Sequence, residues 1–136
     1  MALPFLDTNV LLRHFLQDHA EHSPRATAFL TRVERGEVRV HISDVVLFET
    51  VFILERQYRQ PKPTVRDLVL GLIELPSVVL PAKHRWHRVV DRYVDANLPI
   101  ADAYHTVLME QLETDQIITF DRDFDRVPGI RRVEPS

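Results

Sequence analysis

The stretch that decides the fold is "FLDTNVLL", residues 5–12, in which polar residues interrupt an apolar run. The apolar segment 3–6 predicts a short buried strand, and "VLLRHFL", residues 10–16, has the spacing of a helix. Asp7 therefore stands where a strand ends and a helix begins. A carboxylate among apolar residues loses hydration, which is unfavourable unless hydrogen bonds, a cation or a helix N-terminus compensates. Asp7 is thus either a helix cap or part of a site.

The rest of the chain continues this alternation of strands and helices. Helices are predicted from Ser23 and Pro24 to Gly36, over residues 45–58 behind a Ser43 cap, and over 65–75 behind Thr64, then at 84–97 and 100–112. Strands are predicted at residues 37–43, 77–81, 116–120 and 130–133. Such alternation predicts an α/β fold with a mainly parallel sheet, and 136 residues suit a single domain spanning 1–136.

Composition excludes several classes of protein. The chain has no cysteine, which excludes disulfides, thiolate zinc sites and cysteine nucleophiles. No apolar run approaches the roughly 18 residues that span a bilayer, so we expect a soluble cytoplasmic protein without a membrane segment. The formal net charge of -3 leaves nucleic acid open as a partner, because backbone binding depends on local basic surface.

Four acidic residues stand at positions where a carboxylate needs an explanation. Asp7 and Asp121 directly follow predicted strands, and Asp102 begins a predicted helix after Pro99. Glu49 has apolar residues three and four positions away on both sides, so we expect it in a buried stripe, where it needs a partner.

Each acid alone also suits a structural role. Asp7 and Asp102 could offset a helix dipole, Asp121 could close a turn, and Glu49 could pair with a buried arginine. Together, acids at one edge of a parallel sheet would repel one another and demand a cation. Oxygen ligands suit one or two Mg²⁺ or Mn²⁺ ions, so the pattern predicts metal-assisted hydrolysis of a phosphodiester.

Four ordered segments resemble the PIN-domain nucleases, specifically the VapC-type toxins of bacterial toxin and antitoxin pairs. The segments are "FLDTNVLL", "SDVVLFETVFILER", "LPIADAYH" and "ITFDRDFDRVPGIRRVEP", and the resemblance covers almost the whole chain. It implies a three-layer α/β/α sandwich, an endoribonuclease that needs Mg²⁺ or Mn²⁺, a homodimer, and inhibition by a cognate antitoxin. The acidic positions of the family fall on Asp7, Glu49, Asp102 and Asp121, with Asp7 and Asp102 as the principal metal ligands.

Further residues beside these acids are candidates for supporting roles. Asn9 and Thr119 could hydrogen-bond the metal ligands. Asp123 could take a weaker part in the site, although a solvated loop acid is the simpler interpretation. Arg122 and Arg126 could hold RNA phosphates, and the alternative for each is a solvated or interface arginine.

Other functions remain alternatives to a toxin. A PIN-fold RNA-processing nuclease and an RNA-binding scaffold, both outside a toxin and antitoxin pair, share the same segments. A phosphoaspartyl phosphatase is disfavoured because Asn9 stands where that chemistry commonly uses a second aspartate. His14, His19 and His22 do not share one helical face throughout, which disfavours zinc.

Overall fold

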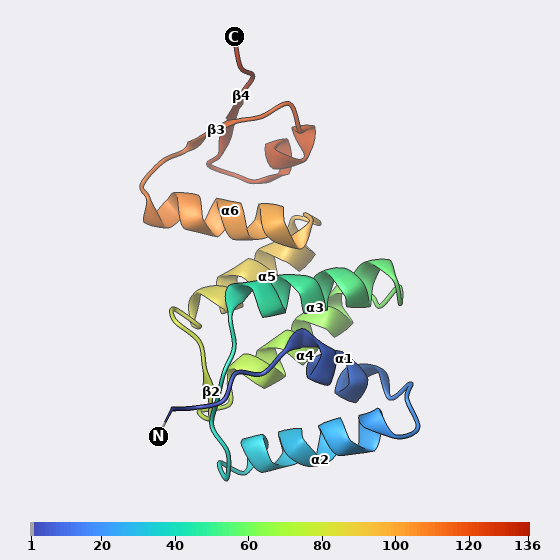
Figure 1. Ribbon diagram of the computed structural model, residues 1–136. Coiled ribbons are helices and arrows are strands. Elements are labelled where there is room, and N and C mark those ends of the chain that lie inside the picture. The colour runs from blue at the N-terminus through green and yellow to red at the C-terminus, as the bar shows by residue number, and fades with distance from the viewer. Residues whose placement is uncertain (1) are drawn as a thin grey trace. The chain divides into compact units, whose positions relative to one another are not determined.

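Helices and short parallel strand pairs build both parts of the chain, which a computed structural model describes over residues 2–136 (Figure 1). The chain divides into two units, residues 1–84 and 85–136. The α/β class with parallel strands, predicted from the alternating pattern, is confirmed.

The first unit contains four helices and one strand pair within its described residues. Helix α1 packs against α2 and α3, and α3 packs against α4. Strands β1 and β2 pair in parallel, with Val40 opposite Val78. The bounds are α1 Thr8–Leu16, α2 His22–Glu34, β1 Val40–His41, α3 Asp44–Arg56, α4 Lys62–Ile73 and β2 Val78–Val79.

The second unit contains two helices and a pair of strands, with a 3-10 helix, η1, between the strands in the sequence. Helices α5 and α6 pack together, and β3 pairs in parallel with β4, which places Ile117 opposite Arg132. The core is apolar and includes the fully buried rings of Trp86 and Tyr93. The bounds are α5 Arg85–Asp95, α6 Ile100–Gln111, β3 Gln116–Ile118, η1 Arg122–Arg126 and β4 Arg131–Val133.

The segment before Asp7 differs from its prediction as a buried strand. Only Phe5 forms a bridge, to His41, and the side chain of Phe5 is 60% exposed while Leu6 is buried. The backbone N–H of Leu6 donates to the carbonyl of His41 at 2.8 Å, and the N–H of His41 donates to the carbonyl of Pro4 at 2.9 Å. Because Pro4 has no N–H, the ladder cannot extend further toward the N-terminus.

Two predicted helix starts are wrong and one is confirmed. Helices α2 and α4 begin before Ser23 and Thr64, which lie inside them. At the start of α2 the ring Nδ1 of His19 accepts the backbone N–H of His22 at 2.8 Å, so a histidine ring satisfies that donor. Ser43 caps α3 as predicted, because its hydroxyl oxygen accepts the N–H of Val46 at 3.2 Å.

The helices of residues 2–136 all lack the combination of length and apolar character that crossing a bilayer requires.

Replacing the cap of α3 should weaken the fold measurably. We expect Ser43→Ala to lower the free energy of unfolding by about 1 kcal/mol, because the N–H of Val46 loses its partner. Urea denaturation measures this change. Thr64→Ala is the matched control, since Thr64 is exposed inside α4 and does not cap it. An equal loss in both variants would contradict the capping role of Ser43.

Candidate functional site

Asp7 occupies the N-cap position of α1 without using its carboxylate as a cap. Its backbone is extended, with φ −85° and ψ 154°, and its side chain makes no capping hydrogen bond. The residue is exposed, whereas its neighbours Leu6 and Thr8 are buried. The capping alternative therefore does not account for this carboxylate, whose oxygens are available to a ligand.

Asn9 lies close to Asp7, as the sequence predicts. Both residues line a cavity of about 510 Å³ whose walls are the N-terminal segment, α1 and α2. The sequence interpretation did not single out the other residues that line this cavity, among them Phe5, Arg25 and Phe29. They come from separate elements, and no local pattern in the sequence associates them.

Glu49 is not buried, and the prediction of a buried stripe is wrong. It lies on an exposed face of α3 together with Val45, 61% exposed, and Phe52, 56% exposed. The core side of α3 is formed by residues 46, 47, 50, 51 and 54. Because α3 is apolar on nearly every side, its pattern does not reveal which side faces the core. Within residues 2–136 Glu49 forms no ion pair, which rules out the buried arginine pair there.

Asp102 and the acids of η1 are brought together in the second unit. Asp102 is half-buried in the first turn of α6. Burial raises the pKa of Asp102 above its usual value, and the negative charges of Asp121 and Asp123 raise it further, while His105 acts in the opposite direction. The favourable dipole at the start of α6 does not outweigh these effects. The negative charges of Asp121 and Asp123 thus lie close enough to Asp102 to disfavour its ionised form.

Asp121 closes a turn and belongs to this acidic group at the same time. It is the N-cap of η1, and its Oδ1 accepts the backbone N–H of Asp123 at 2.9 Å. The hydroxyl oxygen of Thr119 accepts the backbone N–H of Asp121 at 3.0 Å. Thr119 thus holds the main chain beside the acid, whereas the sequence interpretation expected it to bond a metal ligand.

Asp123 and Arg126 form an ion pair within η1. The distance between Arg126 Nη2 and Asp123 Oδ1 is 2.6 Å, and Nη1 of Arg126 also donates to the carbonyl of Asn97 at 3.1 Å. The side chain of Asp123 is 45% exposed, and a part for it in the site stays a prediction. Arg122 is exposed. Of the two arginines proposed for RNA, Arg126 is therefore held in place by its neighbours.

The donor chemistry of the acidic group suits a divalent cation. Mg²⁺ commonly takes one or two protein carboxylates and completes its shell with water and substrate phosphates. The carboxylates of Asp102 and Asp121 supply such oxygens, and their repulsion is relieved by a cation. No group of three or more His, Cys, Asp or Glu side chains in residues 2–136 is arranged to hold a metal ion. The convergence of all four predicted acids stays a prediction.

Comparison with known proteins identifies the family. The model of the PIN domain family matches residues 5–130, a range that includes all four predicted acids. PIN domains are generally metal-dependent nucleases. None of the curated proteins matches the chain.

Removing the charge of Asp102 should stabilise the metal-free protein. We expect Asp102→Asn to raise the free energy of unfolding in EDTA, because a half-buried negative charge is removed and with it the repulsion from Asp121 and Asp123. Urea denaturation provides the measurement. Asp115→Asn is the matched control, since Asp115 is exposed in the loop before β3, and its change should stay within about 0.5 kcal/mol. A lower stability of Asp102→Asn in EDTA would contradict the repulsion.

Proposed function

Because this chain belongs to the PIN domain family, we propose that it is an endoribonuclease that hydrolyses RNA phosphodiester bonds with Mg²⁺ or Mn²⁺. The observation that carries the proposal is the crowding of carboxylates around Asp102, whose pKa is raised by burial and by Asp121 and Asp123. Repulsion between carboxylates lowers the stability of the folded protein. Groups that lower stability in this way are typical of functional sites. A bound divalent cation would recover that stability.

The proposed roles follow from the chemistry of each acid. Asp7 and Asp102 serve as principal metal ligands, and Asp121 and Glu49 complete the set directly or through water. Support for Asp7 comes from its uncapped, exposed carboxylate, and support for Asp102 from its negative surroundings. Glu49 rests on the resemblance and on its exposed, unpaired position on α3.

The bound cation would activate a water molecule and stabilise the negative charge that develops on the phosphate. The residues of the chain then supply position and charge. Asp121 is kept in place by its bond to the N–H of Asp123 and by Thr119 at its own N–H. Arg126, fixed by Asp123 and by the carbonyl of Asn97, offers a guanidinium group to a phosphate of the substrate. Preorganised groups of this kind avoid the cost of ordering during the reaction.

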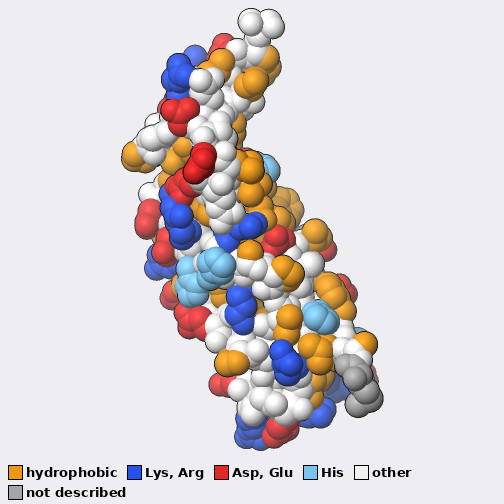
Figure 2. Space-filling model, turned by 90° about the vertical axis from the view of Figure 1, so that its left-hand side faces the viewer, with side chains coloured by type: hydrophobic (Ala, Val, Ile, Leu, Met, Phe, Trp, Pro, Cys, Tyr) orange, Lys and Arg blue, Asp and Glu red, His pale blue; other side chains and the backbone are white. Residues whose placement is uncertain are grey.

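RNA contacts must come from local sets of basic residues. The face shown in Figure 2 carries acidic, basic and apolar side chains interspersed with one another. The formal net charge of -3 agrees with this mixture. Binding to the RNA backbone therefore depends on particular arginines such as Arg122 and Arg126 rather than on a uniformly basic surface.

Metal-dependent cleavage of RNA tests the proposal. The purified protein should cut total cellular RNA with Mg²⁺ or Mn²⁺ and stop when EDTA is added. We expect Asp7→Asn and Asp102→Asn each to lower the cleavage rate roughly a hundredfold or more, since each loses a metal ligand. Gel analysis of the cleavage products measures the rate. Asp67→Asn, an exposed acid of α4, is the matched control and should cleave normally.

Two results would contradict the proposal. Full activity of Asp7→Asn or Asp102→Asn would remove that acid from the site. Absence of cleavage of tRNA and rRNA by the free protein, with either metal, would favour the RNA-binding scaffold.

We further propose that the protein acts in the cytoplasm as a VapC-type toxin, forms a homodimer and is neutralised by a cognate antitoxin. The support is the resemblance of the four segments and the exposed apolar side chains of Val45 and Phe52 on α3. Exposed apolar side chains of this size favour a protein partner over solvent. The alternative is an RNA-processing nuclease of the same family.

Expression in bacteria separates these two roles. We expect induction of the wild-type chain to arrest growth, and Asp102→Asn to leave growth unchanged at equal soluble protein levels. Co-expression of the product of a small overlapping upstream reading frame should restore growth, and gel filtration should show the two proteins eluting together. Unchanged growth with soluble, nucleolytically active wild-type protein would favour the RNA-processing nuclease.

A further inference from the structure

The cavity beside Asp7 combines aromatic rings with arginines. Its volume is about 510 Å³, within the usual range for sites that bind small ligands. Phe5 lines it from the N-terminal segment, Arg13 from α1, and Arg25 and Phe29 from α2. Asp7 also lines this cavity, so whatever occupies the cavity is close to a proposed metal ligand.

The aromatic side chains of the cavity are accessible to a ligand. The ring of Phe5 is 60% exposed although its backbone is bridged to His41, and Phe29 is half-buried. Accessible rings beside a basic group are the usual means by which proteins bind unpaired bases, because every base has a face that can stack. A duplex hides these faces within its own base stack.

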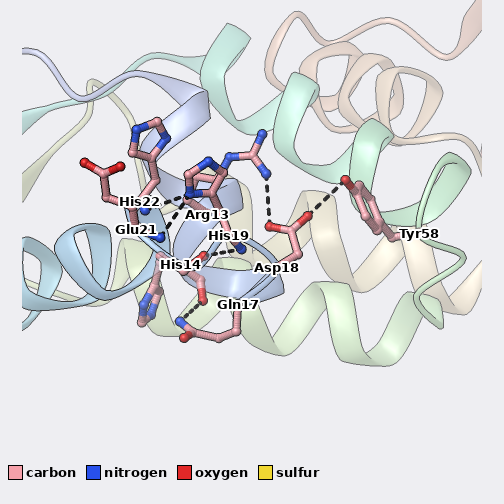
Figure 3. A network of polar contacts seen from close by, with 9 residues as sticks. Arg13, His14, Gln17, Asp18, His19, Glu21, His22 and Tyr58 are labelled. Atoms are coloured by element: carbon pink, nitrogen blue, oxygen red, sulfur yellow. Dashed lines mark hydrogen bonds and ion pairs between the residues drawn. The ribbon is translucent and has the colours of Figure 1, made fainter.

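The two arginines differ in their freedom to bind an anion. Figure 3 shows Arg13 directed at Asp18, which it contacts at 3.0 Å, while the hydroxyl of Tyr58 donates to the other oxygen of Asp18 at 3.3 Å. Arg13 is thereby fixed as part of the wall.

Arg25, in contrast, is held only loosely. Its nearest carboxylate is Glu21, 3.7 Å away, and the two side chains are 74% and 73% exposed. Exposed pairs of this kind contribute little, so Arg25 can exchange Glu21 for a phosphate.

We propose that this cavity holds one unpaired nucleotide of the RNA substrate, with its base against Phe5 and Phe29 and its phosphate at Arg25. The inference rests on the proposed nuclease function and adds a binding site for one nucleotide, formed by residues of the N-terminal segment and α2 beside Asp7. A neighbouring phosphate then reaches the side of the cavity formed by Asp7 and Asn9.

Binding to a short RNA in EDTA tests the inference without cleavage. The probe is a fluorescein-labelled single-stranded RNA of about eight nucleotides, and its dissociation constant is measured by fluorescence anisotropy. We expect Phe5→Ala to weaken binding at least about fivefold, and Phe5→Trp to retain it, because stacking needs the ring. A duplex of the same sequence should bind more weakly and be insensitive to Phe5→Ala.

The phosphate contact has its own signature in the salt dependence. Arg25→Ala should reduce the slope of log Kd against log salt concentration by about 0.7, the contribution of one phosphate of a single strand. Arg35→Ala is the matched control, because Arg35 is an exposed arginine at the end of α2 that does not line the cavity. Circular dichroism and urea denaturation establish that each variant is folded.

The outcomes separate this inference from the proposed function. Wild-type affinity in Phe5→Ala, equal affinity for single strand and duplex, or no binding by the wild-type protein overturns the nucleotide site, even if RNA is cleaved normally. Binding that requires Phe5 and Arg25, without any cleavage, retains the nucleotide site and overturns the nuclease function. Loss of antitoxin binding in Phe5→Ala with unchanged RNA binding assigns the cavity to a protein segment and also overturns the inference.

Discussion

In the second unit the carboxylate of Asp102 is half-buried close to Asp121 and Asp123, and both its burial and their negative charges disfavour its ionised form. Like charges in a partly desolvated place lower stability, so other interactions must compensate. The compensation comes from a core in which Trp86 and Tyr93 are fully buried, and from the parallel pair β3 and β4 that flanks η1. A bound cation, as proposed above, would relieve the same repulsion.

In the first unit Asp7 is exposed, whereas the residues on either side of it in the sequence are buried. Leu6 and Thr8 are 3% and 5% exposed, and Asp7 between them is exposed. The hydroxyl of Thr8 has no hydrogen-bond partner among residues 2–136, a loss of about 1–3 kcal/mol that the packing of α1 must offset. Each unit therefore contains a locally unfavourable group close to one of the predicted acids, the Thr8 hydroxyl beside Asp7 and the half-buried carboxylate of Asp102.

Much of the secondary structure can be predicted from the sequence because it depends on interactions between residues close together in the chain. Ser43 reads as a cap and acts as one, and Gly36 ends the region of α2 with a left-handed backbone, φ 76°, that glycine adopts without strain. The predicted start of α2 is wrong because the ring of His19 takes the place of a usual capping side chain, and that of α4 is wrong because Pro63 stands in the first turn and Thr64 follows it inside the helix. Capping propensity says which residue types often cap a helix, whereas the side chain that bonds the free N–H groups in a given protein depends on local geometry.

The sequence by itself determined the alternation of strands and helices and the positions of Asp7, Asp102 and Asp121 at the ends of elements, since periodicity and capping act over a few residues. The exposure of Glu49 could not be predicted from local sequence, since burial depends on which side of an apolar helix packs against its neighbours in the folded chain. Only the tertiary structure decided which distant residues meet. Asp102 lies near Asp121 and Asp123, and Phe5 lines one cavity with residues of α2, because folding alone brings separate elements together.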